Sequence, residues 1–212
     1  MAALSEKLRI IQFNSPVIMV YTILSFAVSI VGSITHGRSN RLLFSVYRSR
    51  LTDPFTYFRM VGHVLGHSGF NHYFNNFMLI LMIGPILEEK YGSALMLIMI
   101  LLTAVITGII FLIFSKKLSL CGASGIAFML ILLGAYVNIK SGTVPLTLIL
   151  VAIAYIGREA YQGIVHKDGL SHMTHIVGGL CGAFLGYCLN IVGIKAISDS
   201  LNLIIDKLFS IF

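Results

Sequence analysis

Long apolar runs separated by short polar segments fill most of this chain. Six runs predict membrane-spanning helices, over residues 17–34, 71–87, 93–114, 124–137, 143–161 and 173–194. A helix rises about 1.5 Å per residue, so about 20 apolar residues cross a hydrocarbon core of about 30 Å. The pattern therefore predicts an all-α polytopic membrane protein with six transmembrane helices.

The fourth run, residues 124–137, is too short for a full crossing. Its residues would form only about 21 Å of helix, against about 30 Å of hydrocarbon. This short fourth helix must therefore begin below the membrane surface. The backbone before it, residues 118–123, then needs hydrogen-bond partners from the protein or from water in a cavity, because hydrocarbon has none. We expect the functional site at this point.

The composition supports a membrane protein and excludes other classes. Hydrophobic residues make up 57% of the 212 residues and charged residues only 11%, which is far from a water-soluble domain. The net charge is +7, but the cations lie between apolar runs, so they indicate contact with the lipid bilayer and no nucleic-acid partner. The three cysteines form no CxxC pair, so we expect no disulfide framework and no bound metal.

The polar segments divide the chain into one membrane domain with two flanking segments. We assign residues 15–196 to the membrane domain, residues 1–14 to an N-terminal interfacial segment, and residues 197–212 to an amphipathic C-terminal tail that lies on the membrane. The longest connection, residues 36–70, mixes five arginines with large apolar side chains. Such a mixture is typical of a loop half-embedded among lipid headgroups.

Polar residues gather at one end of three predicted helices. Because consecutive spans alternate in direction, the second, fourth and sixth begin on the same side of the membrane. Their first residues include His72 and Asn76 on the second span, Ser124 on the fourth, and His172 and His175 on the sixth. Ionisable groups in a bilayer are costly and indicate function. The topology thus predicts one polar cluster.

The residue types in this cluster suit acyl transfer. Ser124 needs a neighbouring imidazole to take its proton, and a tetrahedral oxyanion needs preorganised donors. His72, Asn76 and the N–H groups of an uncapped helix start can supply those donors. Gly122 and Gly125 would let backbone and substrate approach closely.

A stripe of small residues predicts how the sixth helix packs. Gly178, Gly182 and Gly186 recur at every fourth position, which forms a groove for close approach of another helix. We expect this groove to receive the fourth helix. That packing would bring His175 alongside Ser124.

Two histidines compete for the role of base. His175 is favoured because the glycine groove follows it closely, and His172, one turn outward, is the rival. Phe128 lies four residues after Ser124, on the same helical face, and can stack on the imidazole. No acidic residue has a helical spacing to His175, so we expect a serine–histidine dyad.

These motifs resemble those of a known family. They are Gly122-Ala123-Ser124-Gly125, His72-Tyr73-Phe74-Asn75-Asn76, and His175 followed by Gly178 and Gly182, with further agreement at Arg59, His67 and Glu88. Over residues 58–187 the sequence resembles the rhomboid intramembrane serine proteases. This resemblance implies a six-helix bundle with a water-accessible cavity.

The resemblance also implies roles for single residues. Ser124 would be the nucleophile and His175 the general base and acid, with no cofactor. The oxyanion hole would comprise His72, Asn76 and the backbone at Gly122 and Ser124. The supporting residues would be Phe128, Gly178, Gly182, Arg59 and Glu88. Phe58 and Phe128 stand where the family often has Trp and Tyr, and we expect these changes to alter stability or rate without abolishing catalysis.

The resulting hypothesis is an endopeptidase that cleaves single-span membrane proteins near the outer end of their helix. Substrates would enter between the second and fifth spans, under a loop at residues 163–171. We expect a multi-pass protein of a bacterial inner membrane whose site opens to the extracytoplasmic side. Six cations then lie inside and nine outside, against the positive-inside tendency, but five of the nine belong to the embedded first loop.

Three other functions compete with this hypothesis. A catalytically inactive rhomboid-like protein could bind and escort membrane helices, but it would not need Ser124 with His175. A channel or transporter is less consistent, because only one span is short. A zinc site at His63, His67 and His72 lacks the glutamate that a zinc-protease helix carries, since position 64 is Val64.

Overall fold

The computed structural model describes residues 14–115, 119–136, 144, 146–165, 169–193, 197 and 200. Within these residues the chain forms eight helices: α2 (Pro16–Ile34), α3 (Arg38–Leu43), α4 (Pro54–Gly62), α5 (Phe70–Tyr91), α6 (Ser93–Phe114), α7 (Ser124–Ala135), α8 (Leu146–Val165) and α9 (Gly169–Val192). Apart from residues 14, 197 and 200, the predicted interfacial segment and C-terminal tail lie outside the described residues, as does the loop at 166–168.

Several of these helices fit an integral membrane protein. Pro16–Ile34, Ser93–Phe114 and His172–Asn190 are long and apolar enough to cross a bilayer, and Ser124–Ala135 and Leu146–Tyr155 are shorter apolar helices. Each predicted span corresponds to one observed helix, and α6 has the predicted bounds. The sequence thus predicted the long helices correctly.

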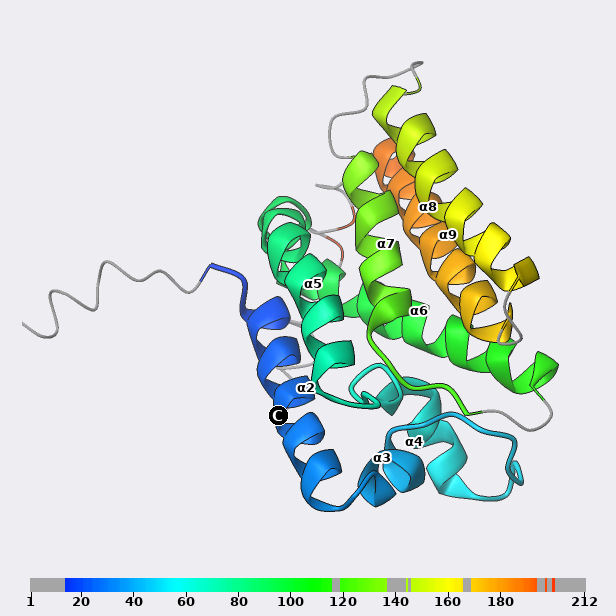
Figure 1. The fold of residues 1–212 in the computed structure, drawn as a ribbon. Coiled ribbons are helices and arrows are strands. Elements are labelled where there is room, and N and C mark those ends of the chain that lie inside the picture. The colour runs from blue at the N-terminus through cyan, green and yellow to red at the C-terminus, as the bar shows by residue number, and fades with distance from the viewer. Residues whose placement is uncertain are drawn as a thin grey trace, which may run out of the picture.

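α7 lies at the centre of the bundle (Figure 1). It contacts α5, α6, α8 and α9, and its side chains from Met129 to Leu133 are buried. With 12 residues, α7 is about 18 Å long. The predicted short fourth helix is therefore confirmed, and it is surrounded by other helices.

Backbone-to-backbone contact joins α7 to α9, as the glycine stripe predicted. A Cβ atom added at Gly178 would overlap the carbonyl oxygen of Gly125 and lie 2.9 Å from its Cα. A Cβ added at Gly182 would overlap the carbonyl oxygen of Met129 in the same way. Only glycine permits this spacing between the two helices.

The first loop contains two helices that the sequence analysis did not predict, α3 and α4. Asp53 caps α4 by accepting a hydrogen bond from the Phe55 N–H at 3.0 Å. Arg59 is buried and fixes the loop, since its Nε donates to the Leu42 carbonyl at 2.8 Å and its Nη1 lies 3.2 Å from Asp53 Oδ2. Its guanidinium also lies over the Tyr47 ring, 4.6 Å from the centroid.

Glu88 lies inside α5, which extends beyond the predicted end of the second span at residue 87. α5 continues to Tyr91 and ends at Gly92, which has φ 84°. The buried Glu88 carboxylate accepts hydrogen bonds from the N–H groups of Val17 and Ile18, both at 2.9 Å. These N–H groups begin α2 and have no partner within that helix. Glu88 therefore caps α2 from α5, and its charge is compensated inside the bundle.

Candidate active site

Ser124 is the first residue of α7, and an extended segment leads to it. In this segment, the N–H and carbonyl of Leu120 pair with Val46 of the first loop at 2.8 and 2.9 Å. Gly122 has φ 140°, a conformation that favours glycine. Its N–H donates to the carbonyl oxygen of His63 at 2.9 Å. Gly122 thus lets other groups of the site approach closely, but its N–H is already bound to the His63 carbonyl.

His72 and the Ser124 hydroxyl meet at Gly122. A Cβ atom added there would lie 2.9 Å from His72 Nε2 and 3.7 Å from Ser124 Oγ. Any side chain at position 122 would therefore fill the space between the imidazole and the hydroxyl. The structure brings the beginnings of α5 and α7 together here, as helix parity predicted.

Asn76 lies one turn after His72 on α5, and it is 7% exposed. Its Nδ2 atom is among the buried side-chain atoms without a hydrogen-bond partner in the described part of the chain. Buried donors are rarely left unpaired unless function requires it. This amide is therefore available to an oxygen that arrives with a ligand.

α9 brings His175 to the same end of α7. The rings of Phe128 and His175 are stacked, with centroids 5.0 Å apart and planes 9° apart, which confirms the predicted stacking. The ring of His172 lies at an edge to that of His175, with centroids 5.9 Å apart.

His67 holds the backbone before Ser124, a role that the sequence analysis did not assign. Its Nε2 accepts a hydrogen bond from the Ala123 N–H at 3.2 Å, and its Nδ1 lies 3.2 Å from the Leu65 carbonyl. This pattern places the proton on Nδ1. Burial lowers the pKa of His67 to about 4, and the nearby His72 adds to the effect, so His67 is neutral at pH 7.

His63 supports the same segment through its carbonyl, which binds the Gly122 N–H. Its imidazole is buried and lies 3.0 Å from the Met60 carbonyl through Nδ1. Burial lowers the pKa of His63 to about 4. Because backbone groups occupy both nitrogens of His67 and one of His63, these two side chains have a structural role rather than that of metal ligands.

Ser68 is a second residue that sequence reasoning missed. Its Oγ lies 3.1 Å from His72 Nδ1, so it fixes the ring whose Nε2 faces Gly122. Ser68 stands four residues before His72, but it precedes α5. Helical spacing therefore gave no reason to pair them.

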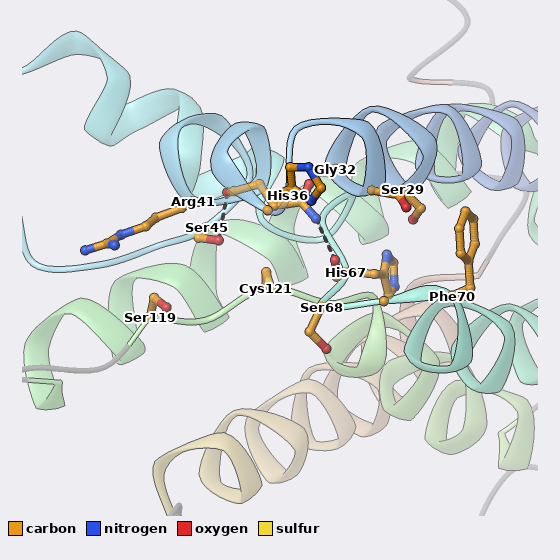
Figure 2. A pocket seen from close by; sticks show the side chains of 14 residues that line it. Ser29, Gly32, His36, Arg41, Ser45, His67, Ser68, Phe70, Ser119 and Cys121 are labelled. Carbon is orange, nitrogen blue, oxygen red and sulfur yellow. Dashed lines mark hydrogen bonds between the residues drawn. The ribbon is translucent and has the colours of Figure 1, made fainter.

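Two recesses are relevant to the site. A polar pocket of about 360 Å³ borders it and is lined by Ser68 and Cys121 among others (Figure 2). An apolar groove of about 620 Å³ lies farther along α7, between α5, α7 and α8, and is lined by residues such as Met82, Ile131 and Val151.

Comparison with known families agrees with the motifs. Residues 54–191 match the rhomboid domain, and this range contains Ser124, His175, His72 and Asn76. A search of curated proteins gives no match. The family match covers more than half of the chain and spans the helices from α4 to α9. This protein belongs to the rhomboid family.

Proposed function

We propose that this protein is an intramembrane serine endopeptidase with a Ser124–His175 dyad. The observation that carries the proposal is that His72 Nε2 and Ser124 Oγ both lie close to Gly122, while the amide of Asn76, one helical turn after His72, is unpaired. A hydroxyl with donors around it, below the surface of an apolar bundle, is the arrangement that acyl transfer needs.

The proposed reaction has two stages. Ser124 Oγ attacks the substrate carbonyl carbon while His175 takes the hydroxyl proton, and His175 then gives that proton to the leaving amine as the peptide bond breaks. Water, deprotonated by His175, next attacks the acyl-enzyme. As the acyl bond to Ser124 Oγ breaks, His175 gives that proton to Oγ, which releases the new carboxyl group and restores Ser124. In both stages the oxyanion accepts hydrogen bonds, and a single such donor contributes about 10²- to 10³-fold to the rate.

Three donors serve that oxyanion in our proposal: His72 Nε2, Asn76 Nδ2 and the Ser124 N–H. The Ser124 N–H begins α7 and so has no partner within the helix. When the Ser68 hydroxyl donates to His72 Nδ1, the proton of the neutral imidazole resides on Nε2. Ser68 therefore sets the tautomer that makes His72 a donor.

Phe128 takes over the positioning that a carboxylate provides in a serine–histidine–aspartate triad. Its ring stacks on His175 with planes 9° apart, which restricts rotation of the imidazole. The missing hydroxyl, compared with Tyr, removes a polar contact but leaves this stacking surface. A dyad thus remains our proposal.

The substrate class follows from the apolar groove. Its α7 residues, from Ile131 to Ala135, follow Ser124 by 7 to 11 positions, which is about 10–16 Å along the helix. A substrate helix in this groove would extend past Ser124 at its end, so cleavage would occur near the end of that helix. We therefore propose single-span membrane proteins as substrates, with entry between α5 and α8.

The extended segment before Ser124 would bind the substrate backbone. Leu120 pairs with Val46 on one side, so Ser119 and Cys121 direct their backbone groups to the opposite edge. A substrate unwound from its helix could add there as a strand. Such unwinding favours substrates with small or helix-destabilising residues near the cut.

The membrane arrangement completes the proposal. We propose that α2, α5, α6, α7, α8 and α9 are the six transmembrane helices of one membrane domain. We further propose a bacterial inner membrane, with the site open to the extracytoplasmic side. Protease mapping of the segment at residues 115–119 in sealed vesicles tests this orientation, because that segment would lie outside.

Cleavage of a single-span reporter by the purified chain tests the function. Ser124→Ala should abolish cleavage and preserve folding, because the first residue of α7 is only half-buried. Ser39→Ala, a serine in α3 whose hydroxyl bonds with Thr35, is the matched control and should cleave normally. If Ser124→Ala cleaves like the natural chain, the serine mechanism is wrong. If the natural chain binds reporters without cleaving them, the escort hypothesis is favoured.

A further inference from the structure

The polar pocket lies between α2, the first loop and the segment that leads to Ser124 (Figure 2). Asn40 forms a fixed part of its wall. The Asn40 side chain is 8% exposed, and its Nδ2 donates to the His67 carbonyl at 2.6 Å. A Cβ added at Gly32 of α2 would lie 2.6 Å from the same nitrogen. The pocket is therefore held in shape by close packing of α2, α3 and the turn before α5.

This pocket borders the candidate active site. Ser68 lines it and contacts His72. Ser119 and Cys121 also line it, whereas Leu120 between them packs with Val46 and Phe111. A substrate strand along residues 119–121 would thus lie beside the pocket and could direct side chains into it.

The charge at the pocket is positive. Its lining includes one cationic side chain, Arg41, and contains no carboxylate. Within residues 35–69 the only acidic residue is Asp53, which Arg59 binds. The other four arginines of this loop are exposed: Arg38, Arg41, Arg48 and Arg50. The first turn of α5, after the uncapped Gly69, adds the partial positive charge of a helix start.

We infer that the polar pocket selects substrates with an acidic side chain close to the scissile bond, on the side away from the membrane helix. This inference rests on the proposed function. A substrate helix in the apolar groove reaches Ser124 from the α8 side, so the flanking segment continues towards α2. A substrate strand that pairs beside residues 119–121 and reaches Ser124 would span about five of its own residues at about 3.3 Å each, which sets the range of positions for the acid.

A panel of reporters tests this selection with the full chain in phospholipid-free detergent at low salt. Each reporter carries Asp, Asn or Lys at one of the first five flanking positions. At the best position, we expect kcat/KM to be about fivefold higher with Asp than with Asn, as for a partly exposed charge pair, and lowest with Lys. High salt should reduce the preference, because it screens exposed charges.

Arg41→Gln should abolish the preference for Asp, and Arg41→Glu should reverse it in favour of Lys. Arg50→Gln is the matched control, because it removes an exposed arginine of the same loop that does not line the pocket. Equal cleavage of Asp and Asn reporters, or an unchanged preference in Arg41→Gln, would overturn the inference. So would an effect of Arg41→Gln that appears only in vesicles with anionic lipid and equally for all reporters, since the pocket would then serve lipid phosphate.

The outcomes separate this inference from the proposed function. If no reporter is cleaved, the proposed function fails, and competition between Asp and Asn peptides for binding to the same chain still measures the pocket. Binding that is several-fold tighter for Asp would keep the inference as one about recognition, and equal binding would end it. Cleavage without any charge preference would leave the protease and remove the selection.

Discussion

α7 and the segment that leads into it are held in different ways. Along α7, glycines of α9 let two backbones touch, as at Gly178 against Gly125. Just before α7, the first loop binds the backbone through single hydrogen bonds, from Gly122 to the His63 carbonyl and from Ala123 to His67. The packed part sets where the nucleophile and base lie, and the hydrogen-bonded part sets the shape of the space around Ser124.

The largest effect should come from Gly178→Ala, which breaks the packed part. The new Cβ would overlap the Gly125 carbonyl, so α7 and α9 must separate. We expect a loss of about 3 kcal/mol in unfolding free energy and about a hundredfold loss of cleavage. Gly179→Ala is the control, because the nearest atom to its Cβ would be in the Leu132 side chain at 3.6 Å, an ordinary contact distance. Similar stability in the two variants would contradict the close packing.

The next largest effect is a loss of stability at low pH, caused by His63 and His67, which hold the segment before α7. The folded pKa of His63 and of His67 is about 4, below the ordinary 6.5. As pH falls below 6.5, the unfolded chain therefore takes up protons that the folded chain does not, and stability decreases until about pH 4. Each histidine should lower the free energy of unfolding by about 2 kcal/mol when the pH falls from 7 to 5.

Denaturant unfolding at the two pH values measures this loss. His67→Gln cannot titrate, so it should lose about 2 kcal/mol less than the natural chain over that interval. An identical pH dependence in both proteins would mean that His67 takes up its proton over the same pH range in the folded chain as in the unfolded chain, which contradicts its lowered pKa.

A smaller effect should come from removing the hydrogen bond between the Ala123 N–H and His67. His67→Leu leaves the Ala123 N–H without the acceptor that it has in the structure, and we expect about a tenfold fall in kcat from the displaced loop. His67→Gln keeps an acceptor oxygen and should retain most of the activity. If the two variants are equally active, the bond to Ala123 does not position the loop.

The smallest effect should come from Ser68→Ala. This change removes the hydrogen-bond partner of His72 Nδ1. A neutral hydrogen bond contributes about 1 kcal/mol, so kcat should fall about threefold to tenfold. The proposed role in the tautomer predicts a matching change in the NMR signals of the His72 ring. Normal kcat together with an unchanged tautomer would remove Ser68 from the mechanism.

The comparison also explains how far the sequence could predict the structure. The helices, the short α7 beginning at Ser124, the contact of Gly178 and Gly182 with α7, and the stacking of Phe128 all follow from apolar length or from helical spacing. Each rests on a pattern within one helix, such as the length of an apolar run, the spacing of glycines in α9 or the position of Phe128 four residues after Ser124. The packed part of α7 was therefore predictable.

The hydrogen-bonded part was not predictable in the same way. His67 and Ala123 are 56 positions apart, and Glu88 caps α2 across 70 positions. In each case the partner is a backbone group, which has no signature in the residue type. The helices α3 and α4 were missed because they are short, with 6 and 9 residues, and lie in a loop of mixed polarity.

The proposed mechanism requires Ser124 to be a nucleophile that His175 activates. A fluorophosphonate probe that reacts with activated serines tests it directly, with the labelled residue located by mass spectrometry. The proposed Ser124–His175 dyad predicts one adduct, on Ser124, that disappears in His175→Ala and persists in His172→Ala. Absence of labelling in the natural chain, an adduct on another serine, or loss of labelling in His172→Ala with retention in His175→Ala would contradict it.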